Sequence, residues 1–270
     1  MHPTNREIIA EYRKYRKGRP IVRAGISTRE YPHIFDPSHS SNWRIYDAEK
    51  SIGYHYDRLF LKTLDGLRDL AVADVRPLVT QEKYSSCVGR NKCVYGPNPY
   101  TVRWKPDYDY YLSLDDDIYL QPGQFLEMLD CADAHPGACV TALYRDANGP
   151  EGVEQYCLGD FFLGEPVCFT DKIIVEDVGR YKFAGLGAML IPASVLYGIP
   201  FPVFRTGRFP VYRPDPEDPR MTKEYWFESQ EDVEFSQMLL KLEIPLLLKG
   251  FAQHRDMLPG DAVLEYLKNH

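Results

Sequence analysis

Residues 107–129 read DYDYYLSLDDDIYLQPGQFLEML, and this stretch decides the fold. In Tyr110–Leu114, the side chains of Tyr110, Leu112 and Leu114 alternate with those of Tyr111 and Ser113, which is the two-residue period of a β-strand. Pro122 stands where a helix would begin, and proline is well tolerated at the first helical position. Phe125 and Leu129 then fall on one face of that helix. A strand that leads into a helix in this way indicates an α/β domain.

The same alternation of strands and helices continues on both sides of this stretch. Patterns of apolar residues and turn residues predict the following elements: a short helix over 5–17, a strand over 20–27, a helix over 47–70, strand material at 71–79, strands over 139–143 and 244–248, and a helix capped by Ser229. Residues 31–43 and 84–106 are expected to be irregular. Residues 205–220, rich in proline and charge, are expected to form a loop that could act as a lid. We therefore expect a single α/β domain whose mixed central sheet is flanked by helices.

One segment tests whether the chain crosses a membrane. No charged residue occurs from Phe183 to Phe204, and that length would span a bilayer. Pro192, Pro200 and Pro202 would break such a helix repeatedly. A buried strand, a short helix and a turn explain the segment better, so we expect no integral membrane association.

Composition and charge set limits on function. The chain has 270 residues, of which 44% are hydrophobic and 26% charged, as in ordinary globular domains, and this excludes a disordered, collagen-like or coiled-coil protein. The net charge of -7 argues against broad wrapping by nucleic acid. The first 30 residues nevertheless hold eight basic and three acidic residues. We expect a basic helical arm over 1–19, the main domain over 20–255 and a helical tail over 256–270.

The cysteines indicate the compartment. There are six, none in a Cys-x-x-Cys pair, which gives no support to a zinc ribbon or a thioredoxin-like site. Their density is too low for a disulfide scaffold. No apolar stretch at the N-terminus has the features of a signal peptide. Reduced thiols in the cytoplasm are the expectation.

The candidate chemistry begins with the acidic triplet Asp115–Asp117, at the end of the predicted strand Tyr110–Leu114. If the backbone stays extended, Asp115 and Asp117 project to one side and Asp116 to the other. Paired carboxylates are suitable ligands for Mg²⁺ or Mn²⁺, and open α/β sheets bind ligands at the carboxyl ends of their strands. The alternative is a solvated acidic turn before the next helix, because acids favour helix N-termini.

Three further candidates are acid–base or metal-ligating residues. Glu231 and Asp232 fall in the first turn of a predicted helix, where they could complement the helix dipole or supply a general base. His254 follows the predicted last strand and could complete a metal shell begun by Asp115 and Asp117. A packing or surface histidine is the ordinary alternative.

Three residues could contact a ligand. Gly185 and Gly187 would let the backbone approach a ligand closely, or would serve tight core packing. Trp226 could stack on a sugar or a base, or could belong to the core.

Taken together, the order of these features resembles the GT-A glycosyltransferases, especially their family-2-like members. The resemblance covers roughly 20–255 and is carried by four segments, RPIVRAGISTRE (19–30), the acidic strand and helix of 107–129, KFAGLGAMLIPASVL (182–196) and ESQEDVEFSQMLLKLEIPLLLKG (228–250). It implies a GT-A fold, a Rossmann-like nucleotide-sugar-binding domain. An acidic residue expected at the end of the second strand is not evident in residues 71–83, and the acceptor motif is only partly present.

The resemblance implies a role for each site residue. Asp115 and Asp117, with His254 as third ligand, would hold Mn²⁺ or Mg²⁺ against the diphosphate of a nucleotide-sugar donor. Asp116 would lie near the nucleoside, and Thr28 and Arg29 beside the nucleotide. Asp232, next to Glu231, would deprotonate the acceptor hydroxyl if the reaction inverts configuration.

The implied activity is a metal-dependent hexosyl or pentosyl transfer, with a UDP-sugar favoured as donor. The acceptor would be a glycan, a protein or a hydroxymethylated base of phage-type DNA, in a bacterial or phage-infected cytosol. Two alternatives stay open. A sugar-nucleotide pyrophosphorylase would need a glycine-rich basic loop after the first strand, and GISTRE supplies one glycine. A non-enzymatic domain could use the aspartates to bind Ca²⁺ and sugar.

Overall fold

The structure is a computed structural model. It describes residues 19–29, 44–47, 52–55, 58–70, 73–82, 86–95, 106–146, 151–162, 165–171, 181–215, 217–218, 220–254 and 257–269. The predicted basic helix of 5–17 and the predicted loop of 31–43 lie outside the described residues.

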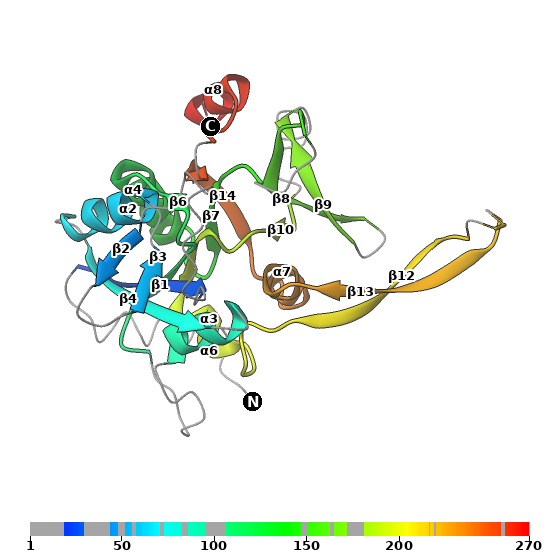
Figure 1. Cartoon of the computed structure of the whole chain (residues 1–270), viewed down its shortest axis with the longest axis horizontal. Helices are drawn as coiled ribbons and strands as arrows, with labels where there is room; N and C mark the ends of the chain where they lie inside the picture. Colours follow the sequence, from blue (N-terminus) through cyan, green and yellow to red (C-terminus); the bar gives the residue numbers. More distant parts are fainter. Residues whose placement is uncertain are drawn as a thin grey trace.

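A six-stranded mixed sheet forms the centre of the molecule (Figure 1). Its order is β14-β7-β11-β5-β1-β4, with β1 at Ile21–Arg29, β4 at Asp74–Glu82, β5 at Tyr110–Leu114, β7 at Cys139–Leu143, β11 at Ala188–Pro192 and β14 at Leu246–Phe251. β1 runs parallel to both β4 and β5, and β14 runs parallel to β7, whereas β11 is antiparallel to its two neighbours. The expectation of a mixed α/β sheet flanked by helices is confirmed.

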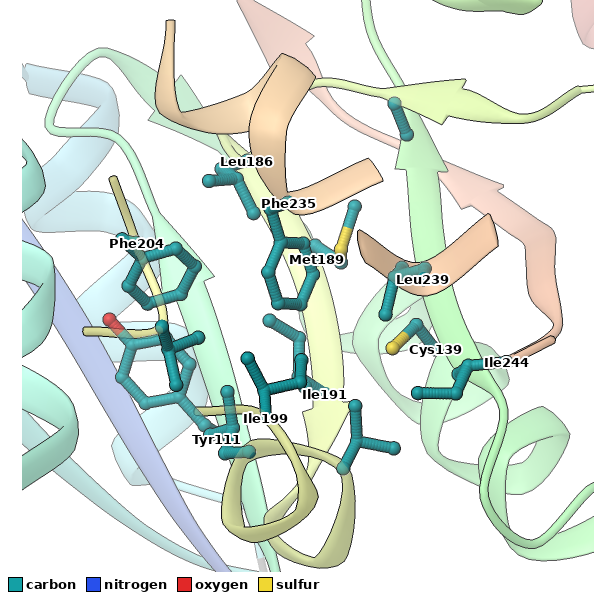
Figure 2. Close-up of a cluster of buried hydrophobic side chains, with 14 of the residues drawn as sticks. Tyr111, Cys139, Leu186, Met189, Ile191, Ile199, Phe204, Phe235, Leu239 and Ile244 are labelled. Atoms are coloured by element: carbon teal, nitrogen blue, oxygen red, sulfur yellow. The ribbon is translucent and has the colours of Figure 1, made fainter. Parts of the chain in front are cut away.

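Helices cover both faces of this sheet. Among the described residues these helices are α2 (Arg58–Arg68), α3 (Ser86–Tyr95), α4 (Pro122–Ala134), α6 (Ala193–Gly198) and α7 (Glu231–Lys241), and a further helix, α8 (Asp261–Asn269), follows near the C-terminus. One apolar cluster joins α2 and α4 to the sheet through residues such as Leu67 and Phe125. The other cluster joins α3, α6 and α7 to the opposite face and includes Leu196, Phe235 and Leu239 (Figure 2).

The predicted alternation in β5 divides these two clusters. Tyr110, Leu112 and Leu114 belong to the α2–α4 side, and Tyr111 belongs to the other. All five residues of the strand are buried, because β5 is an inner strand with a layer of helices on each face. Pro122 occupies the first turn of α4, as predicted.

The uncharged segment also folds as predicted. It forms β10 (Phe183–Ala184), the buried strand β11, the short helix α6 and the turn beyond it. Within the described residues, no helix is both long enough and apolar enough to cross a membrane.

Smaller sheets surround the centre. β2 (Arg44–Asp47) pairs with β3 (Ile52–His55), β8 (Gln155–Phe162) pairs with β9 (Glu165–Thr170) and with β10, and β6 (Ile118–Tyr119) pairs with β15 (Gln253–His254). The β6–β15 pair joins the chain after the acidic triplet to the segment that carries His254.

The predicted lid loop of 205–220 is wrong. Residues Gly207–Pro214 form β12, which pairs along its whole length with β13 at Thr222–Ser229. The two strands make a long hairpin arm that projects away from the body of the molecule (Figure 1). Proline fits there because a two-stranded ribbon has two edges, and an edge strand tolerates a missing N–H donor.

Three other boundaries differ from the prediction. The helix predicted over 47–70 begins only at Arg58, since residues 52–55 form β3. The region predicted to be irregular contains the helix Ser86–Tyr95, whose inward side carries polar residues that hide the helical period. The cap predicted at Ser229 is Gln230, which makes no side-chain capping bond, and Ser229 ends β13.

We predict that Tyr111→Phe leaves the free energy of unfolding unchanged or raises it by about 1 kcal/mol. The Tyr111 hydroxyl is buried and finds no hydrogen-bond partner among the described residues, so its removal relieves a desolvated polar group. Tyr108→Phe is the matched control, because the Tyr108 hydroxyl donates to the Val94 carbonyl at 3.2 Å and its loss should cost about 1 kcal/mol. Urea unfolding of both variants checks the contrast, and a similar loss in both would contradict it.

Candidate functional site

Several of the predicted residues lie at the carboxyl edge of the central sheet. Ile26 of β1 lies opposite Leu114 of β5, and the backbone of Thr28 and Arg29 continues past that point while still paired with β4. β4 lies on one side of β1 and β5 on the other, which makes this edge a topological switch point, the usual ligand crevice of an open α/β sheet. The side chains of Thr28 and Arg29 are outside what the structure describes.

The acidic triplet forms a turn and does not continue the extended strand. The Asp115 N–H donates to the Gly187 carbonyl at 3.0 Å, and the Ile118 N–H donates back to the Asp115 carbonyl at 3.3 Å. The second bond closes the turn around Asp116 and Asp117, and β6 follows directly. The alternation expected for an extended triplet is therefore wrong, and the directions of the three side chains are set by the turn.

Asp117 and His254 are brought together. His254 lies opposite Ile118 in the β6–β15 pair, and its Nε2 is 3.3 Å from Asp117 Oδ2. The other ring nitrogen, Nδ1, is 2.6 Å from the Arg145 carbonyl, and the ring of Tyr144 meets the imidazole edge-on. The side chains of His254 and Asp117 are only 12% and 24% exposed, so the residues around them restrict their positions.

This geometry fits a bound divalent cation. A carbonyl can only accept, so Nδ1 carries a proton toward Arg145 and the lone pair of a neutral ring lies on Nε2, toward the Asp117 carboxylate. The lone pair of His254 Nε2 and the Asp117 Oδ2 oxygen would repel one another unless a proton or a metal ion lies between them. Burial alone lowers the pKa of His254, but the hydrogen bond and charge of Asp117 outweigh it and raise that pKa overall. A carbonyl that orients a histidine through its second nitrogen is a common arrangement around metal ligands.

Asp115 is held differently. Its Oδ1 forms an ion pair and hydrogen bond with the guanidinium of Arg90, a residue that the sequence did not single out. Among the described residues, no three His, Cys, Asp or Glu side chains are already gathered in the manner of metal ligands. Of the three predicted ligands, the structure thus joins Asp117 to His254, while Asp115 is engaged by Arg90.

The first turn of α7 brings two carboxyl groups toward this edge. Glu231 Oε1 is 3.5 Å from Arg90 Nε, and the Cys87 thiol donates to Glu231 Oε2 at 3.7 Å. Asp232 accepts from the Val233 N–H at 2.8 Å. Burial, followed by the negative charge of Glu231, raises the pKa of Asp232 to about 6. A carboxyl group with such a pKa is suited to accept a proton near neutral pH.

The two glycines pack against Tyr144 beside the triplet. A Cβ on Gly187 would lie 2.8 Å from the Tyr144 hydroxyl and 2.9 Å from Asp115 Oδ2. A Cβ on Gly185 would collide with the same hydroxyl and lie 3.0 Å from Cys157 Cβ. The Tyr144 hydroxyl also accepts the Gly187 N–H at 2.9 Å. Both glycines therefore serve close packing, and Gly187 lets the Asp115 carboxylate approach the backbone.

Trp226 lies on the hairpin arm, in β13 opposite Pro210. Its side chain is outside the described part of the chain, and the arm leads away from the sheet edge where the acidic residues gather (Figure 1). Its predicted stacking role stays a prediction.

Arg90 is the functional candidate that sequence reasoning missed. It lies in residues 84–106, which were expected to be irregular, and the buried residues of its helix include the polar side chains of Arg90 and Asn91. A buried arginine leaves little trace in a hydrophobicity pattern, because the same letter usually marks a solvated surface.

Comparisons with known proteins give similarity to solved structures alone. No family model matches the chain, and no curated protein sequence matches it. A197 from STIV is 13% identical with a TM-score of 0.46, over 86% of this chain and 83% of that one. Glucosyl-3-phosphoglycerate synthase from Mycobacterium tuberculosis, in complex with Mn²⁺ and UDP-glucose, is 11% identical with a TM-score of 0.40, over 99% and 80%. GalNAc-T7 with UDP, GalNAc and Mn²⁺ is 10% identical with a TM-score of 0.42, over 88% and 44%.

Proposed function

We propose that the chain is a metal-dependent glycosyltransferase of the GT-A class, which moves a sugar from a nucleotide-diphosphate donor to an acceptor hydroxyl with inversion. The observation that carries the proposal is the meeting of Asp117 and His254 at 3.3 Å, at the sheet edge where β5 ends. Asp232 supports it from the same edge, because its raised pKa suits a base. The order of motifs along the chain, which resembles that class, agrees with both.

Asp117 and His254, with Asp115 beside them, would hold Mn²⁺ or Mg²⁺. The ion would stabilise the negative charge that develops on the nucleoside diphosphate as it leaves. Negative charge is concentrated at this edge, because Asp115, Glu231 and Asp232 lie near the guanidinium of Arg90, and Asp117 lies against His254. Carboxylates this close repel one another, and a bound cation offsets that repulsion.

Asp232 would take the proton from the acceptor hydroxyl. A hydroxyl group is a weak nucleophile near neutral pH, and a positioned carboxylate raises its reactivity as the new bond forms. Glu231 raises the pKa of Asp232 by its charge and so makes it a stronger base. In this proposal Asp116, Thr28 and Arg29 lie against the nucleotide, and Trp226 stacks on a sugar or base. Gly185 and Gly187, expected from the sequence to admit a ligand or to serve packing, take the packing role beside Tyr144.

A UDP-sugar is the favoured donor, carrying a hexose or a pentose. The acceptor would be a glycan, a protein or a hydroxymethylated base in phage-type DNA. The basic residues before residue 20 favour an acceptor that bears phosphate. A DNA acceptor would make transfer fall steeply as salt rises from about 50 to 200 mM, because phosphate contacts release counterions. Transfer to DNA that is insensitive to salt would contradict the role given to these residues.

Thermal melting with nucleotides tests the donor class. We expect UDP to raise the stability of the chain only when Mn²⁺ or Mg²⁺ is present, by about 2.7 kcal/mol at 100 times its dissociation constant. GDP, CDP and ADP serve as matched nucleotides, and the metal without nucleotide as a further control. Because acceptor and donor sites can be coupled, the series is repeated with candidate acceptors.

The same series separates the alternatives. Stabilisation by Ca²⁺ and free sugar, with no response to any nucleotide, would favour the non-enzymatic sugar-binding domain. Binding of a nucleoside triphosphate together with a sugar phosphate would favour the pyrophosphorylase. No response to any nucleotide, with or without acceptor, would overturn the glycosyltransferase proposal.

A further inference from the structure

Arg90 is a buried cation at the centre of the candidate site. Its side chain is 5% exposed, and it comes from α3, which supplies none of the residues predicted for the site. Burying an unpaired guanidinium would be costly, so its partners explain why it is tolerated there. Burial by itself lowers the pKa of Arg90, but the charges of Asp115 and Glu231 outweigh it and raise that pKa, and the group stays charged.

The partners of Arg90 come from three separate parts of the chain. One terminal nitrogen, Nη1, donates to Ser113 Oγ at 2.6 Å and to the Leu186 carbonyl at 3.4 Å. The other, Nη2, donates to Asp115 Oδ1. Nε lies 3.5 Å from Glu231 Oε1 without a hydrogen bond among the described residues, so that ion pair acts through charge. One guanidinium thus contacts the acidic strand end, the glycine segment and the first turn of α7.

Two of these parts hold a proposed donor-side carboxylate, Asp115, and the proposed base, Asp232, and the third is the glycine segment around Leu186. They lie far apart in sequence. Without a common partner, the side chains of each part could rotate independently of those of the others. A planar guanidinium with a fixed fork of donors suits this task, since it fixes direction as well as charge. A lysine would keep the charge but could not reach the same set of acceptors with the same geometry.

We propose that Arg90 is a positioning residue that fixes the Asp115 and Glu231 carboxylates relative to one another. The donor-side metal site and the base on α7 then face the same substrate. This inference rests on the proposed function. It also extends it, because α3 becomes part of the active-site framework. Asn91, the next residue, ties the same helix to the chain before the hairpin arm by accepting the Phe204 N–H at 3.2 Å and donating to the Phe204 carbonyl at 2.6 Å.

The test compares Arg90→Gln and Arg90→Lys with a matched control, Arg23→Gln. Arg23 also pairs with a carboxylate, Asp107, at 2.6 Å and donates to two carbonyls of α3, those of Cys93 and Val94, at 3.4 Å. It lies in β1 opposite Tyr111, three residues before the end of the β1–β5 pairing at Ile26. Loss of Arg23 therefore reports the general cost of removing a partly buried arginine that contacts this helix.

Two readouts are measured on each folded variant, namely the affinity for Mn²⁺ with UDP by calorimetry, and the pKa of Asp232 by carboxyl NMR without nucleotide. Arg90→Gln should weaken binding by about tenfold or more, as loss of a group that orients metal ligands does. It should also raise the pKa of Asp232, since the charge of Arg90 lowers that pKa in the native chain. Arg90→Lys should weaken binding while leaving the Asp232 pKa close to native. Arg23→Gln should change neither.

The outcomes are decisive in both directions. An unmoved Asp232 pKa in Arg90→Gln, or native affinity in Arg90→Lys, would overturn the positioning role. If Arg90→Gln does not fold, Arg90→Lys against Arg23→Lys carries the comparison. If the native chain binds no metal and nucleotide, the proposed function fails, and the pKa of Asp232 still decides whether Arg90 governs the carboxyl on α7.

Discussion

Replacing Asp232 by Asn is expected to lower the rate of sugar transfer by about 10²–10⁴-fold, the range for loss of a general acid or base. The amide keeps the size of the side chain and removes the proton acceptor. Donor affinity should stay near native, because Asp232 is assigned to the acceptor hydroxyl and not to the diphosphate. Steady-state kinetics over a range of acceptor concentrations measure the effect. Glu265→Gln, an exposed acid on α8, is the control and should transfer at the native rate.

The pH profile gives the same prediction a second test. With a pKa of about 6, Asp232 is ionised above that pH and protonated below it. The native transfer rate should therefore be level above about pH 7 and fall about tenfold per unit below about pH 5. The residual activity of Asp232→Asn should lack this step. A variant that keeps the native step would show that another group is the base.

Asp232→Asn should also stabilise the metal-free chain above pH 6. The pKa of this carboxyl is raised from 3.8 to about 6 on folding, so the folded chain holds a proton that the unfolded chain has already lost. The native chain therefore loses stability as pH rises from about 4 to 6, and that loss persists above. The neutral amide avoids it, which corresponds to about 2–3 kcal/mol. Thermal melting at pH 4 and pH 8 measures this difference, which should be present only at the higher pH.

Much of the central sheet could be predicted because the sequence features that specify each strand or helix lie within that element. The strand Tyr110–Leu114 and the helix from Pro122 follow directly from side-chain period and from the fixed φ of proline. The prediction of a strand, a short helix and a turn in Phe183–Phe204 also rests on residues within the segment, since its prolines exclude one long helix. In each case the residues that determine the element lie within it.

The elements that were missed depend on distant partners. The hairpin arm forms by backbone pairing of β12 with β13, two segments of which neither alone shows its partner, and proline within a segment argues against a strand until its edge position is known. Helix α3 carries buried polar side chains, Arg90 and Asn91, whose partners lie in β5 and before the arm. Pattern within α3 alone contains no information about those partners.

In the candidate site, too, local sequence patterns predict some features, whereas others depend on contacts between distant residues. Asp115, Asp117 and Asp232 were singled out because acids at strand and helix ends carry a known chemistry, and His254 because an imidazole after the last strand can be a metal ligand. What the structure adds is their relation, namely that the triplet turns, that β6–β15 pairing brings Asp117 to His254, and that Asp115 is engaged by Arg90. The last two relations come from tertiary contacts over 25 to 137 positions, which no local period encodes.

The second large effect is expected at the metal. Removing the divalent ion with EDTA, or replacing Asp117 by Asn, should lower transfer by about 10³-fold, because a metal acting as a Lewis acid contributes several kcal/mol and about 4 kcal/mol corresponds to that factor. Asp117→Asn keeps a hydrogen bond to His254 within reach but removes the negative charge that would hold the cation. Asp130→Asn, which removes an exposed carboxylate from α4, is the matched control and should not change the rate.

His254→Ala and His254→Asn separate a ligand from a structural histidine. If Nε2 holds the ion, both variants should need a higher concentration of Mn²⁺ for half-maximal transfer, by about 10–100-fold if losing the ligand costs as much as losing a group that orients one. Excess Mn²⁺ should then restore part of the rate. If His254 only pairs with Asp117, its loss should lower the melting temperature and leave the Mn²⁺ requirement unchanged. Because the Asp117–His254 contact is the observation on which the proposed function rests, an unchanged Mn²⁺ requirement in both variants would count against the metal site itself.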